Sequence, residues 1–115
     1  MRMWMIDPKI LCTKHLLGEH VETHMFIGTI IKGKSLDGYV NNNLLEFRQL
    51  YNRHQKLADE MKRRNMNHKS PLPSDDIMIK KYPDNIINSK VNVNKALNEL
   101  LSRCPECLKR YNELN

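Results

Sequence analysis

Apolar residues recur at every third or fourth position in three stretches of the chain, which is the spacing of the buried face of an α-helix. The first stretch begins after Asp7 and Pro8 and ends at Gly33. An aspartate followed by a proline is typical of a helix N-terminus, and a glycine is typical of a helix end. We therefore predict that the first helix covers residues 8–32.

The second and third stretches predict two further helices. The second is expected from about Leu44 to Asn65, with a buried face made of Phe47, Leu50, Tyr51, His54, Leu57, Ala58 and Met61. Its basic residues are expected to face solvent, and they are Arg48, Arg53, Lys56, Lys62, Arg63 and Arg64. The third helix starts near Asn92 and is expected to bury Val93, Leu97, Leu100, Leu101 and Cys104.

The connections between these helices are rich in residues that break regular structure. Glycines and asparagines make residues 33–43 a loop, and two prolines make residues 67–73 irregular. Residues 74–76 are predicted to cap a short helix before Tyr82. No stretch shows the alternation of a β-strand. The pattern therefore predicts an all-α fold in a single compact domain, residues 1–115, with three main helices and loop-rich connections.

The composition fits one hydrophobic core and a polyanionic partner. The chain has 115 residues, of which 40% are hydrophobic, so it can bury one core but not two. Lysine and arginine outnumber aspartate and glutamate by 19 to 13, for a net charge of +6. This balance favours a partner such as DNA. A solvated, lysine-rich surface is the alternative explanation. No obligate protein partner is indicated.

Targeting signals and cysteine content bear on the cellular location. No apolar run approaches the roughly 18 residues of a membrane span, so we expect no membrane partner. No secretory signal is visible at the N-terminus. Three cysteines, an odd number, do not indicate a disulfide framework. We expect a cytoplasmic protein, or a viral protein in the host cell.

The first predicted helix carries a polar stripe on an otherwise apolar segment. His15, Glu19 and Glu22 follow one another at intervals of four and three residues, so their side chains share one helical face. A carboxylate among apolar neighbours tends to have a raised pKa, and such carboxylates recur where protons are transferred. The stripe is therefore a candidate for acid–base chemistry.

Basic residues gather near the chain start and after the second predicted helix. Candidates for contacts with DNA phosphates are Arg2, Lys62, Arg63, Arg64, His68 and Lys69. The alternative is a solvated helix end, where cations favour the helix dipole. Because aromatic residues are few, binding of single strands by serial stacking is not indicated.

Two patterns resemble parts of metal sites. Cys104 and Cys107 form a CxxC, which is half of a structural zinc site, with Cys12 and the five histidines as possible completions. Cys104 also continues an apolar stripe, as a core cysteine would. His20 and His24 lie one helical turn apart and could share a metal, but surface histidines explain the pair better. The sequence alone therefore favours no metal and no cofactor.

Three segments carry a recognisable pattern. Residues 15–22 read His-Leu-x-x-Glu-x-x-Glu, residues 53–67 form a helix that ends in basic residues and a methionine-containing turn, and residues 103–111 join Arg103 through a proline to Tyr111. In this order and register they resemble the pyrimidine dimer DNA glycosylase family, the phage-type endonuclease V enzymes, over about half of the chain.

The resemblance implies a helical enzyme that cleaves damaged double-stranded DNA without a cofactor. Family chemistry makes the N-terminal α-amine the nucleophile, which would be that of Met1 here, and places Glu22 at the sugar. Arg2 and His15 would contact the DNA. An α-amine in general has a pKa of about 7.7–8.0, so a useful fraction is neutral at physiological pH.

The chain also departs from the family pattern. Val21 and Met25 stand where the family has arginines that grip DNA, and Tyr111 alone remains of an aromatic cluster. These differences leave two alternatives. One is a helical DNA-binding or phage accessory protein without catalysis. The other is an interaction module stabilised by zinc at Cys104 and Cys107.

Overall fold

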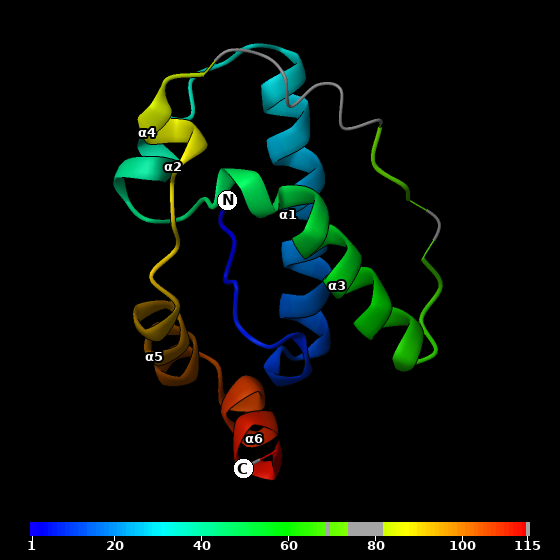
Figure 1. Ribbon diagram of the computed structural model, residues 1–115. Helices are drawn as coiled ribbons and strands as arrows, with labels where there is room; N and C mark the ends of the chain where they lie inside the picture. Colours follow the sequence, from blue (N-terminus) through cyan, green and yellow to red (C-terminus); the bar gives the residue numbers. More distant parts are fainter. Residues whose placement is uncertain (69, 74–81, 115) are drawn as a thin grey trace.

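The computed structural model describes residues 1–68, 70–73 and 82–114. The elements in chain order are the 3-10 helix η1 (Pro8–Ile10), α1 (Thr13–Ile31), α2 (Asp37–Asn41), the 3-10 helix η2 (Phe47–Gln49), α3 (Leu50–Arg63), α4 (Asp84–Ile87), α5 (Val93–Arg103) and α6 (Pro105–Leu114). Every regular element in the described ranges is a helix, as Figure 1 shows, which confirms the all-α prediction.

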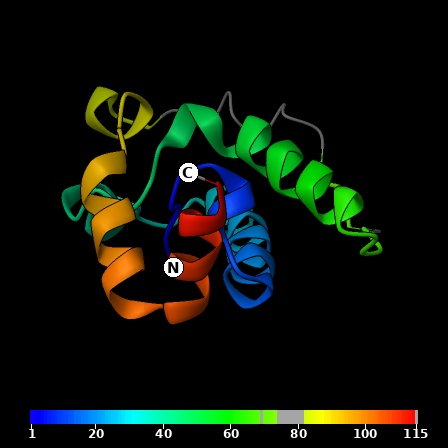
Figure 2. The same cartoon turned by 90° about the horizontal axis from the view of Figure 1, so that it is seen from below.

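The first six residues form a non-helical segment that is part of the core. The segment runs through the middle of the molecule, between α1 and α5 (Figures 1 and 2). Met3, Trp4 and Ile6 are buried, and the Met3 amide donates a 2.7 Å hydrogen bond to the Leu44 carbonyl. Each buried side chain of this size contributes roughly 1.5–3 kcal/mol. The N-terminus is therefore held in place rather than frayed.

A buried ion pair joins α1 to α3. The Arg53 guanidinium donates hydrogen bonds of 2.6 and 2.8 Å to the two carboxylate oxygens of Glu19. It donates a third, of 2.7 Å, to the Ile6 carbonyl. The prediction that Arg53 faces solvent is wrong: the residue is only 3% exposed, because the Glu19 carboxylate provides a paired charge inside the helix interface.

We expect Glu19→Ala to lower the free energy of unfolding by about 3–5 kcal/mol, because it leaves the Arg53 charge buried without its partner. Urea denaturation measures the change. Glu113→Ala, at an exposed position of α6, is the control and should stay within about 0.5 kcal/mol of the parent. If Glu19→Ala lowers the free energy of unfolding by less than about 1 kcal/mol, another group must neutralise the charge of Arg53.

The first two predicted helices differ from the observed ones mainly at their ends. The first is divided into η1 and α1, because Leu11 and Cys12 are extended. The expected loop at residues 33–43 contains the short helix α2. In the second, residues 44–46 are not helical, and α3 follows the 3-10 turn η2.

The predicted third helix is two helices. Cys104 precedes Pro105, and a residue before proline is restricted to extended backbone, so α5 ends and α6 begins there. Val93 is 41% exposed rather than buried. The short helix predicted from residues 74–76 falls largely outside the described residues, and α4 after Pro83 had no prediction.

Within the described ranges, no helix combines the length and the apolar character that crossing a membrane requires.

Candidate functional site

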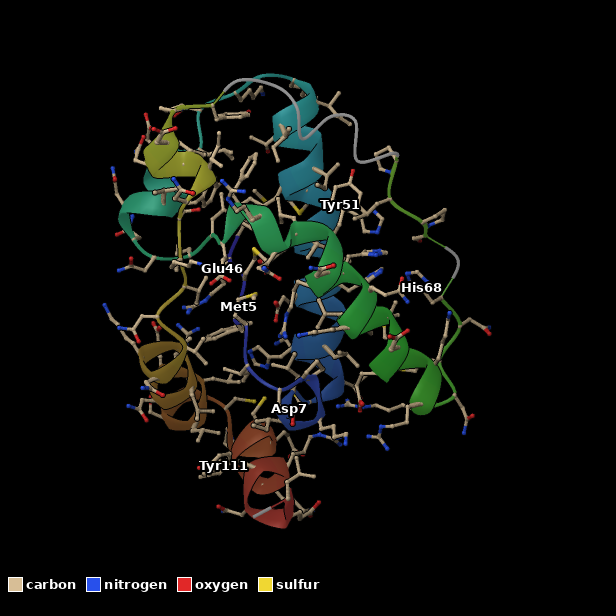
Figure 3. All side chains as sticks on the ribbon, viewed as in Figure 1. Met5, Asp7, Glu46, Tyr51, His68 and Tyr111 are labelled. Carbon is tan, nitrogen blue, oxygen red and sulfur yellow. The ribbon has the colours of Figure 1, made fainter. Side chains whose placement is uncertain are left out.

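A cleft of about 670 Å³ opens between the N-terminal segment, α1 and α5. In Figure 3 the labelled Met5 marks the N-terminal segment between these helices. The polar stripe His15, Glu19 and Glu22 lies along the α1 side. The full lining consists of Met1, Arg2, Trp4, Lys14, His15, Gly18, Glu19, Glu22, Asn42, Asn43, Leu44, Asn92, Lys95, Ala96, Glu99 and Arg103.

Glu22 and the amino group of Met1 share this cleft, and both residues are half-buried. Burial raises the pKa of the Glu22 carboxyl above its ordinary value of 4.5. The positive Met1 amino group and a hydrogen bond from the Arg2 backbone amide oppose this rise only in part. An amine and a carboxylate thus line one cleft, and the charge of the amine acts on the carboxylate.

Glu19, one helical turn before Glu22, also lines the cleft but is held in an ion pair. Its side chain has no exposed area and is committed to Arg53. The two carboxylates of the predicted stripe therefore differ. Glu22 is half-buried in the cleft, whereas Glu19 joins α1 to α3 through its ion pair with Arg53.

Arg2 ties the N-terminal segment to the opposite wall. Its guanidinium bonds the Glu99 carboxylate at 2.9 Å, and it lies 3.6 Å from the ring centroid of Trp4. The hydrogen bond from Arg2 is the main reason that the pKa of Glu99 is lowered. The side chain of Arg2 is 15% exposed. These contacts position the wall of the cleft, and they leave little of Arg2 open to a DNA phosphate.

Three exposed cations lie in the cleft lining, and they are Lys14, Lys95 and Arg103. Lys14 is one of the basic residues that the sequence shows near the chain start, whereas Lys95 and Arg103 could not be assigned to the same surface, because α1 and α5 meet only in the folded chain. Their shared signal in the sequence is weak, since each is one basic residue on the polar face of a helix.

The basic residues at the end of α3 are absent from the lining of the cleft. Arg63 and Arg64 both bond the Glu60 carboxylate, at 2.6 and 2.7 Å. Arg64 also donates to the carbonyl of Leu11 at 2.7 Å. The hydrogen bond from Arg63, followed by that from Arg64, lowers the pKa of Glu60 to about 2. Lys69 lies outside the described residues.

The family model of the pyrimidine dimer DNA glycosylases matches residues 1–74, which is more than half of the 115 residues. The chain belongs to this family. No curated protein and no solved structure matches the chain. Family membership implies glycosylase activity on pyrimidine dimers and binding to damaged DNA. The matched residues include the N-terminal segment, α1 and α3, whereas α5 and α6 lie beyond them.

The described part of the chain also contains two groups of potential metal ligands. The first, here called the Cys3His cluster, consists of Cys12, His15, Cys104 and Cys107, with all four ligand atoms within 4.8 Å of one another. It connects α1, inside the family match, to the junction of α5 and α6, beyond it. The sequence shows the CxxC at 104–107 with Cys12 and the five histidines as possible completions, and the matching spacing of Cys12 and His15 is the signal that could have selected His15 among them.

The second group, here called the histidine cluster, consists of His20, His24, His54 and His68. The Nε2 atoms of His20, His54 and His68 lie within 4.8 Å of one another. His20 is only 6% exposed, so its interpretation as a surface histidine is wrong: it packs against His54 across the interface of α1 and α3. His68, predicted as a phosphate ligand, follows α3 and points into this cluster (Figure 3).

Proposed function

We propose that the chain is a DNA glycosylase with AP lyase activity that uses the Met1 α-amine as nucleophile and Glu22 as the proton-transfer group. The observation that supports the proposal is the shared cleft. There, burial raises the pKa of Glu22, and the positive charge of the Met1 amine lowers it in part. The proposal requires residue 1 to carry a free amino group, which the intact mass of the purified protein reports.

The chemistry follows from these two groups. The neutral amine attacks C1′ of the damaged nucleoside, and the base leaves with the electrons of the glycosidic bond. The amine loses a proton and the sugar ring opens, giving an imine between the protein and C1′. Removal of a C2′ proton then expels the 3′ phosphate and nicks the strand. Glu22, as a carboxylate, accepts the C2′ proton.

The dimensions of the cleft agree with a nucleotide as substrate. Its volume of about 670 Å³ falls in the usual range of ligand pockets, about 300–1,000 Å³. Reaching C1′ within a duplex requires the nucleotide to leave the base stack, and a cleft of this kind receives the extruded group. Asn42 and Asn43 line the same cleft and supply amide groups for hydrogen bonds to a base or sugar.

Borohydride trapping on DNA with an abasic site tests the lyase proposal. Reduction of the imine gives a stable covalent adduct of protein and DNA, visible as a shifted band. An adduct whose cross-linked peptide contains Met1 supports the assignment. An adduct at a lysine, or no adduct while DNA is bound, would contradict it.

One observation favours a second candidate, a DNA-binding protein without catalysis. Val21 and Met25, which replace the arginines of the family pattern, are 53% and 50% exposed. Leu17, one turn earlier, is 37% exposed. This apolar row lies beside the Glu22 face of α1. In this case the protein binds damaged DNA and the trapping reaction gives no adduct.

We expect binding to DNA to depend steeply on salt, with the cations of the cleft making the main phosphate contacts. Lys14→Ala and Lys95→Ala should each flatten the slope of log K against log salt by roughly 0.9, the value for one phosphate contact. Fluorescence anisotropy at several salt concentrations measures the slope. Lys62→Ala removes an equal charge outside the cleft lining and is the control. If Lys62→Ala has the larger effect, the DNA follows α3 instead.

A further inference from the structure

We propose that the Cys3His cluster is a structural zinc site that holds α5 and α6 against the start of α1. This inference does not rest on the proposed function. Three cysteine sulfurs and one imidazole nitrogen are a known ligand set of structural zinc, with bond lengths of about 2.3 and 2.0–2.1 Å. Four such ligands at tetrahedral angles lie roughly 3.5–3.8 Å apart.

The observed distances approach this arrangement. The Sγ atom of Cys12 lies 3.2 Å from Nδ1 of His15 and 3.9 Å from Sγ of Cys104. The Sγ atom of Cys107 lies 3.7 Å from the same Nδ1 atom. All three cysteines are free thiols. Four side chains from two distant parts of the chain thus surround one point.

Local structure explains how the ligands are presented. Cys12 precedes the first residue of α1 and Cys104 precedes the first residue of α6, and in each case the second ligand follows three residues later. The cap residue and the third residue of a helix face the same point, so both pairs are preformed by their helices. The amide of Cys12 donates to Sγ of Cys107 at 3.3 Å, and the amide of Cys107 donates to Sγ of Cys104 at 3.5 Å.

These amide donors and the two helix N-termini place partial positive charge beside the sulfur atoms that would bind the ion. A zinc ion with three thiolates and a neutral imidazole carries a net charge of −1. Lys14 and Arg103 lie close enough to act electrostatically on His15, so positive charge is present to offset it. Soft thiolate ligands in tetrahedral geometry select zinc over magnesium or calcium.

Zinc at this position would fix the far wall of the cleft. The α5 wall contributes Lys95, Glu99 and Arg103 to the lining, and the junction that follows it carries Cys104 and Cys107. His15 is both a cluster ligand and a residue of the cleft, and its ring packs edge-on against Trp4 at 5.9 Å between centroids.

Cobalt substitution tests this site on DNA-free protein. Co²⁺ added to metal-free wild-type protein should give the absorption bands of tetrahedral cobalt and a thiolate-to-cobalt charge-transfer band. In Cys12→Ser, which leaves two thiolates and one imidazole in place of four ligands, the site should no longer retain the ion and the charge-transfer band should be lost. His24→Gln, at a half-buried histidine of α1 outside the Cys3His cluster, is the control and should leave this band unchanged.

Thiol reactivity of the wild-type protein provides a test that requires no variant. Zn²⁺ in excess of two equivalents should slow the reaction of all three cysteines with a disulfide reagent by roughly tenfold or more, because bound thiolates are poor nucleophiles. Equal reaction rates with and without Zn²⁺, or cobalt spectra without a charge-transfer band, would overturn the proposal. Both readouts are independent of glycosylase activity, so their failure is distinct from a failure of the proposed function.

The histidine cluster carries a second, independent inference. We infer that His20, His54 and His68 bind a divalent transition-metal ion such as zinc. The Nε2 atom of His20 lies 3.1 Å from Nε2 of His54 and 2.8 Å from Nε2 of His68. The Nε2 atom of His54 also lies 3.1 Å from that of His24. One ring nitrogen offers either one proton or one lone pair, so hydrogen bonds alone cannot satisfy all these contacts.

A metal ion satisfies them together, because every nitrogen can direct a lone pair at it. Imidazole nitrogens suit zinc, copper and nickel, and zinc takes them at about 2.0–2.1 Å. The ion would hold the segment after α3 against α1. His24 stands beside the three ligands as a possible fourth.

Zinc stoichiometry separates the two sites. Wild-type protein should retain two equivalents of Zn²⁺ against a moderate chelator, and His68→Gln should retain one, with the charge-transfer band of the cobalt form unchanged. Cys12→Ser is the reciprocal control and should retain the equivalent that lacks thiolate character. A single equivalent in wild-type protein, unaffected by His68→Gln, would overturn this second site.

Discussion

Acetylation of the Met1 amino group is expected to reduce strand cleavage by roughly 10³-fold or more, because the positioned nucleophile is removed and a bulk amine does not replace it. An acetyl group takes away the lone pair that attacks C1′, and no lysine side chain contributes to the proposed reaction. Gel analysis of nicked DNA at saturating protein measures the rate. The imine trapped by borohydride should disappear in parallel.

The stability of the acetylated protein and its binding to DNA are the controls for this experiment. Acetylation adds few atoms at a half-buried residue, so the unfolding midpoint should change little and DNA should still bind. α-Amines react before lysines near neutral pH, since their pKa is about 7.7–8.0 against 10.4. Mass spectrometry confirms modification of residue 1 alone. Acetylated protein that still nicks DNA would exclude the Met1 amine as nucleophile.

Glu22→Gln is the second change with a large expected effect. Loss of a positioned acid–base group costs roughly 10²–10⁴-fold in rate, and glutamine preserves the shape of the side chain. Single-turnover cleavage of abasic-site DNA should therefore slow by this factor, with DNA affinity little changed. Glu113→Gln, the exposed carboxylate of α6, is the matched control and should cleave at the parental rate. Normal cleavage by Glu22→Gln would assign the proton transfer to another group.

The pH profile of the wild-type protein gives an independent measurement of Glu22. Cleavage should fall as pH decreases for two reasons, first because the nucleophilic amine is protonated and then, at lower pH, because Glu22 is no longer ionised. Because burial raises the pKa of Glu22, this second limb of the profile should lie above pH 4.5. Glu22→Gln should lose this limb.

The sequence predicted those features that depend on local periodicity. The intervals in His15, Glu19 and Glu22 placed three side chains along one cleft, because helical spacing fixes their shared face. The helical spacing did not show which of the two carboxylates, Glu19 or Glu22, is fully buried. The partner of Glu19 is Arg53, 34 residues away, and no local pattern reveals a charge across a helix interface.

The ligand clusters were hidden for the same reason. Cys12 and Cys104 are 92 residues apart, and their contact depends on how α6 packs against η1. Two residues separate Cys12 from His15, as two residues separate Cys104 from Cys107. This shared spacing is the one local signal that connects the two pairs. The histidine cluster offered only His20 and His24 as a local signal, since His54 and His68 come from the next helix and the segment that follows it.

The position of α5 has a consequence for the order of events during synthesis. The ribosome makes Arg2 before Glu99, its partner in an ion pair, which follows 97 residues later. At about 5–20 residues per second the delay is roughly 5–20 s. During this time Trp4 lacks the contact with Arg103, and the N-terminal segment is not yet held by Glu99. Nascent chains are thus expected to be inactive toward DNA, with activity appearing only once α5 and α6 have been translated.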